Sequence, residues 1–103
     1  MIRIVEDKGF HLELDNGVTV SVQIGTYNYC NSKKVDRNRE SNTAEVAVFR
    51  TEDGEWMTKE VAKMADVSFN GEDDVIGHVS TSDLLSIITA AATHTEDTEK
   101  HGQ

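Results

Sequence analysis

The segment FHLELDNGVTVSVQIG, residues 10–25, decides the fold of this chain. Apolar side chains occupy alternate positions on both sides of Asn16-Gly17, with polar side chains between them. A period of two is typical of strands that bury one face, and Asn-Gly is the strongest short hairpin signal because both residues tolerate a positive φ. The segment therefore predicts an antiparallel hairpin, with strands at 10–15 and 18–24 and the aliphatic side chains on one face.

Three more segments alternate in the same way, namely residues 1–6, 44–50 and 75–79. Residues 81–93 instead repeat apolar side chains at helical spacing, and residues 58–65 do so over a shorter length. We predict an α+β fold: a small antiparallel β-sheet of four to five strands, a C-terminal helix packed on one face, and a second short helix. The domain is expected to span residues 1–93, and the acidic tail 94–103, which lacks an apolar anchor, is expected to be disordered.

The two expected helices also carry predictions about burial. Ser80 precedes the longer helix as its N-cap, and Asp83 follows three residues later, as in a capping box. The buried stripe of this helix is expected to comprise Leu84, Leu85, Ile87, Ile88 and Ala91. In the shorter helix, Val61, Met64 and Ala65 share the expected buried face. Trp56 lies in a possible short partner strand, Glu55-Trp56-Met57, and is expected to fill the core.

The balance of charge restricts the classes of partner. Nineteen acidic and ten basic residues give a formal net charge of −9. Such a field repels polyanions, so we expect no direct binding of nucleic acid or of a membrane, whereas basic protein surfaces are permitted. Only 37% of the residues are hydrophobic, and exposed strand edges invite pairing, so we expect a homodimer or a higher homo-oligomer. A single cysteine, no signal-peptide pattern and no long apolar run predict a cytoplasmic protein.

A basic cluster interrupts this acidic chain directly after the hairpin. Lys33, Lys34, Arg37 and Arg39, less Asp36, give the segment 33–39 a charge of +3, which leaves −12 on the rest of the chain. Nearby Tyr27 and Tyr29 can stack on a base, and Asn28 and Asn31 can form hydrogen bonds in both directions. These eight side chains are the candidate ligand-binding residues, and a small anionic nucleotide is the candidate ligand. The alternative interpretation is a solvated loop whose tyrosines cover the edge of the sheet.

Other chemistry-bearing residues show no catalytic or metal-binding pattern. Cys30 has no spacing that pairs it with His11 or His78 as nucleophile and base, and a small buried thiol at the end of a strand is the simpler interpretation. The four histidines lack metal-ligand spacing, and the acidic run 72–74 lacks the spacing of a calcium loop. The chain contains neither a phosphate-binding glycine loop nor a nucleophile elbow. We therefore expect a protein without enzymatic activity, cofactor or metal.

Three segments together resemble a known group of proteins: VTVSVQIGTYNYC (18–30), AEVAVFRTEDGEW (44–56) and DDVIGHVSTSDLL (73–85). They are similar to small, mostly uncharacterised proteins of tailed bacteriophages that share a TVSVQ-x-G…NYC strand and loop, an EVA strand and a DDV-x-G-x-VS strand before a C-terminal helix. The resemblance covers roughly residues 10–92. It implies a phage origin, the cytoplasm of the host cell, and stoichiometric binding that antagonises host defence.

Three functional hypotheses follow. In the first, the protein sequesters a small anionic, for example cyclic, nucleotide signal: Tyr27 and Tyr29 stack on the base, and Arg37 and Arg39 meet the phosphate. In the second, it is an acidic inhibitor or DNA mimic that masks a basic host nucleic-acid-binding enzyme, with the acidic run 72–74 at the interface. In the third, it is an accessory virion protein without a small ligand.

Overall fold

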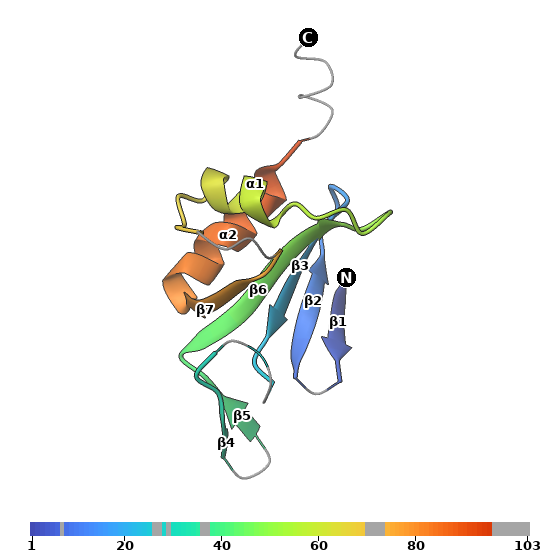
Figure 1. The fold of residues 1–103 in the computed structure, drawn as a ribbon. Helices are drawn as coiled ribbons and strands as arrows, with labels where there is room; N and C mark the ends of the chain where they lie inside the picture. Colours follow the sequence, from blue (N-terminus) through green and yellow to red (C-terminus); the bar gives the residue numbers. More distant parts are fainter. Residues whose placement is uncertain (7, 26–27, 29, 36–37, 70–73, 96–103) are drawn as a thin grey trace.

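The protein folds into a twisted antiparallel sheet with two helices against one side (Figure 1). The computed structural model describes residues 1–6, 8–25, 28, 30–35, 38–69 and 74–95. Within these residues, the main sheet has five strands in the order β1-β2-β3-β6-β7, and a separate hairpin pairs β4 with β5. The strands are β1 (Ile2–Val5), β2 (Gly9–Glu13), β3 (Val18–Gln23), β4 (Lys33–Val35), β5 (Asn38–Glu40), β6 (Thr43–Arg50) and β7 (Ile76–Ser80). The helices are α1 (Thr58–Met64) and α2 (Thr81–Thr93). The α+β fold expected from the sequence is confirmed.

The β2–β3 hairpin closes through a three-residue loop rather than a two-residue one. The Leu14 N–H donates to the Val18 carbonyl at 2.9 Å, and the Gly17 N–H donates to the Leu14 carbonyl at 3.2 Å. Gly17 has a φ of 84°, whereas Asn16 does not adopt a positive φ. A three-residue hairpin loop needs just one left-handed residue at its end, which glycine supplies without strain. The predicted hairpin is therefore present, with Gly17 and not Asn16 in the left-handed conformation.

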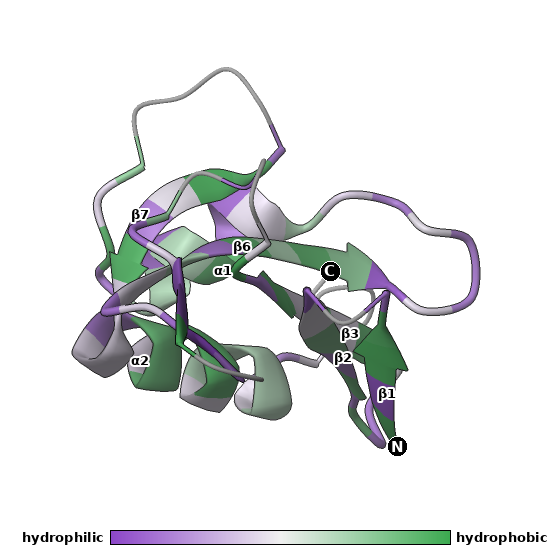
Figure 2. Cartoon of the chain, turned by 90° about the horizontal axis from the view of Figure 1, so that it is seen from below, coloured by the Kyte–Doolittle hydropathy of each residue, from purple (hydrophilic) through white to green (hydrophobic). Residues whose placement is uncertain are grey.

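The core lies between the helices and the face of the sheet that carries the valines. β3 contributes Val18, Val20 and Val22, and β6 contributes Val46 and Val48, all at most 4% exposed. The helices cover them with five buried side chains, Val61, Ala62, Ile87, Ala90 and Ala91. Figure 2 shows apolar stretches along α2 and along the strands of the sheet. The period-two alternation of the sequence thus becomes one buried aliphatic face.

Two expectations about helix burial were wrong. Leu85 is 65% exposed and Met64 is 48% exposed. At 3.6 residues per turn, Leu85 is about 200° around α2 from the fully buried Ile87, so the two side chains point in opposite directions. Met64 lies in the last turn of α1, beside Leu85 in a shallow groove between the helices. The N-cap was predicted correctly, since the Ser80 hydroxyl accepts a hydrogen bond from the Asp83 N–H at 3.2 Å.

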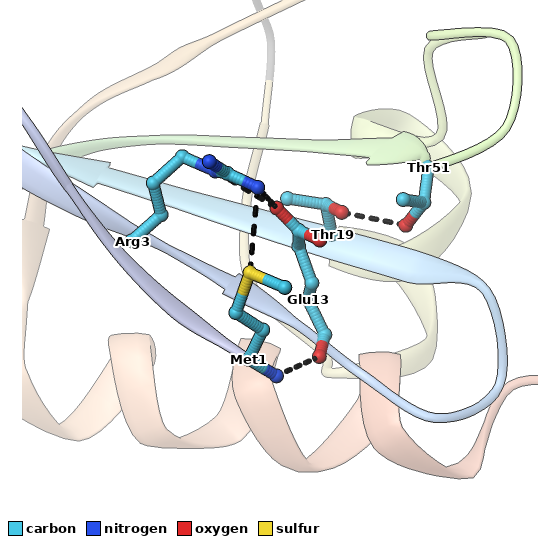
Figure 3. Close-up of polar contacts among 5 residues, drawn as sticks. All are labelled: Met1, Arg3, Glu13, Thr19 and Thr51. Atoms are coloured by element: carbon cyan, nitrogen blue, oxygen red, sulfur yellow. Dashed lines mark hydrogen bonds and ion pairs between the residues drawn. The ribbon is translucent and has the colours of Figure 1, made fainter.

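The edge strand β1 extends past the helices. The helices contact β3, β6 and β7, whereas β1 lies at the other edge of the sheet, away from them (Figure 1). Ile2 and Ile4 consequently stay 72% and 70% exposed, although they alternate like core residues. Polar contacts fasten this strand to β2: the Arg3 guanidinium lies 3.0 Å from the Glu13 carboxylate, and the Met1 amino group donates to the Glu13 carbonyl at 2.8 Å (Figure 3).

Two segments that the sequence predicted as a loop and a disordered tail contain regular or packed structure. The connection at residues 25–42 contains the β4–β5 hairpin, in which Lys34 is paired with Arg39 and Lys33 with Glu40. After α2, His94 is 4% exposed, and its Nε2 contacts the carboxylate of Glu60 on α1. His94 therefore belongs to the folded domain, although the sequence placed it in the tail, and residues 96–103 lie outside the described part. None of the helices described here is long and apolar enough to span a membrane.

Candidate ligand-binding groove

The structure brings part of the predicted site to one groove. A space of about 640 Å³ opens between the β4–β5 hairpin and the adjacent ends of β1, β2 and β3. In Figure 1 this hairpin projects from the end of the sheet where β3 leaves it and β6 enters it. The groove is lined by Ile4, Lys8, Gly9, Phe10, Val22, Ile24, Lys34, Asn38 and Arg39. It therefore combines an apolar part, contributed by the sheet, with a cationic part.

Strand pairing explains the cationic part. Lys34 and Arg39 are opposite each other in the antiparallel ladder of β4 and β5, and residues directly opposite on such a ladder place their side chains on the same side. Lys8 adds a third positive charge from the turn between β1 and β2, where its Nζ lies 3.2 Å from the Glu6 carboxylate. The Arg39 guanidinium donates to the Ser32 hydroxyl at 3.2 Å. Three cations thus converge from two elements that are distant in sequence.

The apolar part follows from the β2–β3 register. Phe10 is paired with Val22, and both belong to the aliphatic face of the sheet. Over β3 and β6 the helices cover this face, but they do not reach this end of it, so Phe10 and Ile24 stay partly exposed. An anion with an apolar portion matches this surface, because charged and apolar groups of the ligand would each meet their complement.

Three predicted residues lie elsewhere. The Asn28 amide donates to the Glu45 carboxylate at 2.8 Å, and its oxygen accepts from the Gly25 N–H at 2.7 Å. Asn31 is exposed, and its N–H donates to the Thr43 hydroxyl at 3.0 Å. Lys33 is paired with Glu40, on the opposite side of the hairpin from Lys34. None of the three lines the groove.

Three more predicted residues, Tyr27, Tyr29 and Arg37, lie outside the described residues. Sequence reasoning in turn missed Lys8 and Phe10 as groove residues. A signal for Phe10 existed, because the hairpin alternation places it on the same face as Val22. Lys8 had none, since it joins the site through the turn between β1 and β2.

The opposite face of the sheet carries an aromatic cluster of His11, Phe49 and Trp56. Trp56 is 51% exposed and packs edge-on against Phe49, with ring centroids 6.0 Å apart. It forms an isolated bridge with Phe49 across from β6, so the expected short pairing exists. The expected core position of Trp56 was wrong. Alternation along β6 directs Phe49 away from the helices, and Trp56 packs against Phe49 on that outer face.

The remaining candidates do not assemble into a reactive centre among the described residues. Cys30 is half-buried, with its Sγ 4.0 Å from the Gly25 carbonyl, and His11 packs against Phe49. No group of three or more histidine, cysteine or acidic residues that could hold a metal ion occurs in the described ranges. Of the acidic run 72–74, Asp74 alone is described, and its carbonyl accepts a hydrogen bond from Thr58 at 2.7 Å.

Comparisons of the chain with protein-family models, with curated proteins and with solved structures found no match.

Proposed function

We propose that this protein is a non-enzymatic binding protein that captures a small anionic ligand of the nucleotide class in the groove between the sheet and the β4–β5 hairpin. The observation that carries the proposal is the pairing of Lys34 with Arg39 beside the apolar surface of Phe10 and Ile24. The volume of about 640 Å³ falls within the usual range for small-molecule sites.

Each part of the groove has a role in this proposal. Lys34 and Lys8 act as point charges toward phosphate, and the planar guanidinium of Arg39 offers a two-pronged contact. Phe10 and Ile24 contact the base or another apolar part of the ligand. Tyr27, Tyr29 and Arg37 adjoin these residues in sequence, and they stay in the proposal as stacking and phosphate-binding groups.

The resemblance to tailed-bacteriophage proteins supports a biological role for such capture. A binding protein without catalytic chemistry acts by stoichiometry, and sequestering a cyclic nucleotide signal in the host cytoplasm would antagonise host defence. A net charge of +3 from Lys8, Lys34 and Arg39 leaves −12 on the remainder of the chain. This acidic background would repel polyanions while the groove attracts a small anion.

A thermal-shift screen against mono-, di- and cyclic nucleotides tests this function. A ligand present at about 100 times its Kd stabilises the folded state by about 2.7 kcal/mol, which raises the melting temperature of a domain this size by several degrees. We expect such a shift for one nucleotide class and its loss in the Lys34→Ala/Arg39→Ala variant.

The matched control is Lys59→Ala/Lys63→Ala, which removes the same charge from exposed positions on α1. It should retain the shift. A flat response across the panel contradicts nucleotide binding. An equal loss of the thermal shift in both variants would show that the shift depends on net charge and not on the groove.

The acidic surface supports the alternative of an inhibitor that masks a basic host protein. That function predicts capture of its target that weakens with added salt and with neutralisation of Glu72, Asp73 and Asp74. The groove variant Lys34→Ala/Arg39→Ala should leave this capture unchanged, so the two functions are separable with the same set of proteins.

A further inference from the structure

A second hollow lies on the face of the sheet opposite the valine core. Ser21 of β3 and Ala47 of β6 are directly paired there, and their short side chains leave a depression of about 270 Å³. Along β6, Glu45 and Phe49 flank Ala47 on the same face, about 13 Å apart at 3.3 Å per residue. The hollow thus has a small-residue floor with a carboxylate at one end and aromatic rings at the other.

The aromatic end is built from three rings. The ring centroids of His11 and Phe49 are 5.7 Å apart with an interplanar angle of 76°, and those of Phe49 and Trp56 are 6.0 Å apart at 86°. Each pair is edge-to-face, so the rings form corners rather than a flat stack. Such rings offer an apolar surface that the methylene stem of a long side chain can cover. Trp56 is 51% exposed, which leaves its indole accessible at the margin of the hollow.

The opposite end carries a positioned negative charge. The carboxylate of Glu45 accepts a hydrogen bond from the Asn28 amide at 2.8 Å, and Asn28 is itself fixed by the Gly25 N–H at 2.7 Å. This contact orients the Glu45 carboxylate at its end of the hollow. The net charge of −9 adds a long-range attraction for cationic partners.

We propose that this hollow binds an arginine side chain of a basic partner protein. The planar guanidinium would hydrogen-bond to Glu45, and its methylene stem would lie over Ser21 and Ala47 toward the Phe49–Trp56 corner. Arginine fits better than lysine because its guanidinium is less strongly hydrated and its planar fork matches a carboxylate. An exposed tryptophan beside such a pocket is typical of the centre of a protein interface. The site lies on the other face of the sheet from the proposed nucleotide groove and does not depend on it.

Trp56 makes the proposal directly measurable. It is the one tryptophan in the sequence, so its fluorescence reports on the hollow alone. The probes are the tripeptide acetyl-Gly-Arg-Gly-amide, its lysine counterpart, and the citrulline counterpart, which keeps the shape of arginine without its charge. We expect a saturable change in Trp56 emission with the arginine peptide and binding weaker by about tenfold for citrulline, as for loss of a charge-assisted hydrogen bond.

Two single-charge variants separate the site from the general field. Glu45→Gln preserves an oxygen that can accept from Asn28. We expect this variant to keep the fold and to bind the arginine peptide about tenfold more weakly. Glu52→Gln removes the same charge from an exposed turn outside the hollow and should leave binding unchanged. Equal binding of arginine and citrulline, equal effects of the two variants, or no saturable response would overturn the proposal. Equal binding of lysine would overturn the choice of arginine. The citrulline comparison needs no variant, so it decides the matter even if Glu45→Gln fails to fold.

Discussion

Asn16 connects two parts of the molecule through its side chain. Its amide nitrogen donates to the Ala91 carbonyl at 2.7 Å and to the His94 carbonyl at 3.0 Å, and its oxygen accepts from the Val18 N–H at 3.2 Å. The last carbonyls of a helix have no partner within the helix. Asn16 therefore closes the end of α2 from the tip of the β2–β3 hairpin, a role that its Asn-Gly sequence context did not indicate.

Replacing Asn16 with alanine tests this role. Asn16→Ala should lower the free energy of unfolding by about 1 kcal/mol, the usual net value for partly exposed hydrogen bonds. The melting temperature should fall by about 4–8 °C. Differential scanning calorimetry measures both quantities. Asn42→Ala is the control, because Asn42 is exposed, and an equal loss in the two variants would argue against the helix-closing role.

Asp53 gives a prediction about pH. The Glu55 N–H donates to its carboxylate at 3.0 Å, and the Arg50 guanidinium lies 2.9 Å from it. The Glu55 N–H first, and then Arg50, lower the pKa of Asp53 below its ordinary value. Because the folded-state pKa is depressed, the associated stabilisation is present above the unfolded pKa and is lost as the pH falls through the folded pKa.

We expect an NMR titration of the Asp53 carboxyl carbon to show a midpoint below that of an unfolded peptide, about 3.9. Arg50→Gln should raise this midpoint only in part, since the Glu55 N–H remains. Arg3→Gln, which removes a charge that pairs with Glu13 instead, should leave it unchanged. An unshifted midpoint in the parent protein contradicts the prediction.

At the scale of elements, Thr58 joins α1 to the sheet. It is 1% exposed, and its hydroxyl accepts from the Val48 N–H at 2.9 Å. The same oxygen lies 2.7 Å from the Asp74 carbonyl, just before β7. One hydroxyl thus fixes the start of the helix to β6 and to the segment that leads into the edge strand.

Thr58→Val keeps the shape and removes these bonds. We expect a loss of about 2 kcal/mol in the free energy of unfolding, because a buried N–H and a carbonyl lose their partner. Urea unfolding followed by circular dichroism measures this loss. Thr89→Val on the exposed side of α2 makes the same chemical change outside the core and should cost little. If Thr58→Val leaves the free energy of unfolding unchanged, the Val48 N–H and the Asp74 carbonyl find other partners in the variant.

Local sequence patterns predicted some elements well and others not at all. The strands and α2 were predictable because each buries a continuous aliphatic face, which leaves a period in the sequence. The β4–β5 hairpin leaves no such trace, since Lys33 and Lys34 are exposed and bury nothing. Leu85 was misplaced for a related reason, because an apolar residue can stand on the exposed face of a helix.

The candidate site depends on assembly, which explains why it was only partly predictable. The basic cluster identified Lys34 and Arg39, whose charge is visible in the sequence. Lys8 and Phe10 join them only because the β1–β2 turn and the start of β2 line the same groove as the hairpin. Asn28 was assigned to a ligand because its chemistry suits hydrogen bonding, but the fold uses that capacity to hold Glu45 and Gly25.

For the whole molecule, the exposed edge of the sheet bears on self-association. Ile2 and Ile4 are about 70% exposed on strand β1, and an apolar edge strand is a surface on which a second chain can pair. The homodimer expected from composition stays a prediction, and this edge is where we expect the two copies to meet.

Ile2→Lys tests that prediction. Sedimentation velocity should show a dimer for the parent protein and a monomer for the variant, because a lysine on an edge strand opposes pairing. Leu85→Lys places the same charge on an equally exposed apolar position of α2 and should remain dimeric. A monomeric parent protein, or a dimeric Ile2→Lys variant, contradicts the assignment of this edge.

The hydrogen bonds from Asn16 to the end of α2 also bear on how the chain folds. Asn16 and Ala91 are 75 residues apart in sequence, and α2 is synthesised after every strand that it covers. Contacts between such distant positions close slowly, because the intervening chain must first lose its freedom. The valine face of β3 and β6 therefore stays uncovered until α2 has been synthesised, and we expect folding to finish only when α2 docks on it.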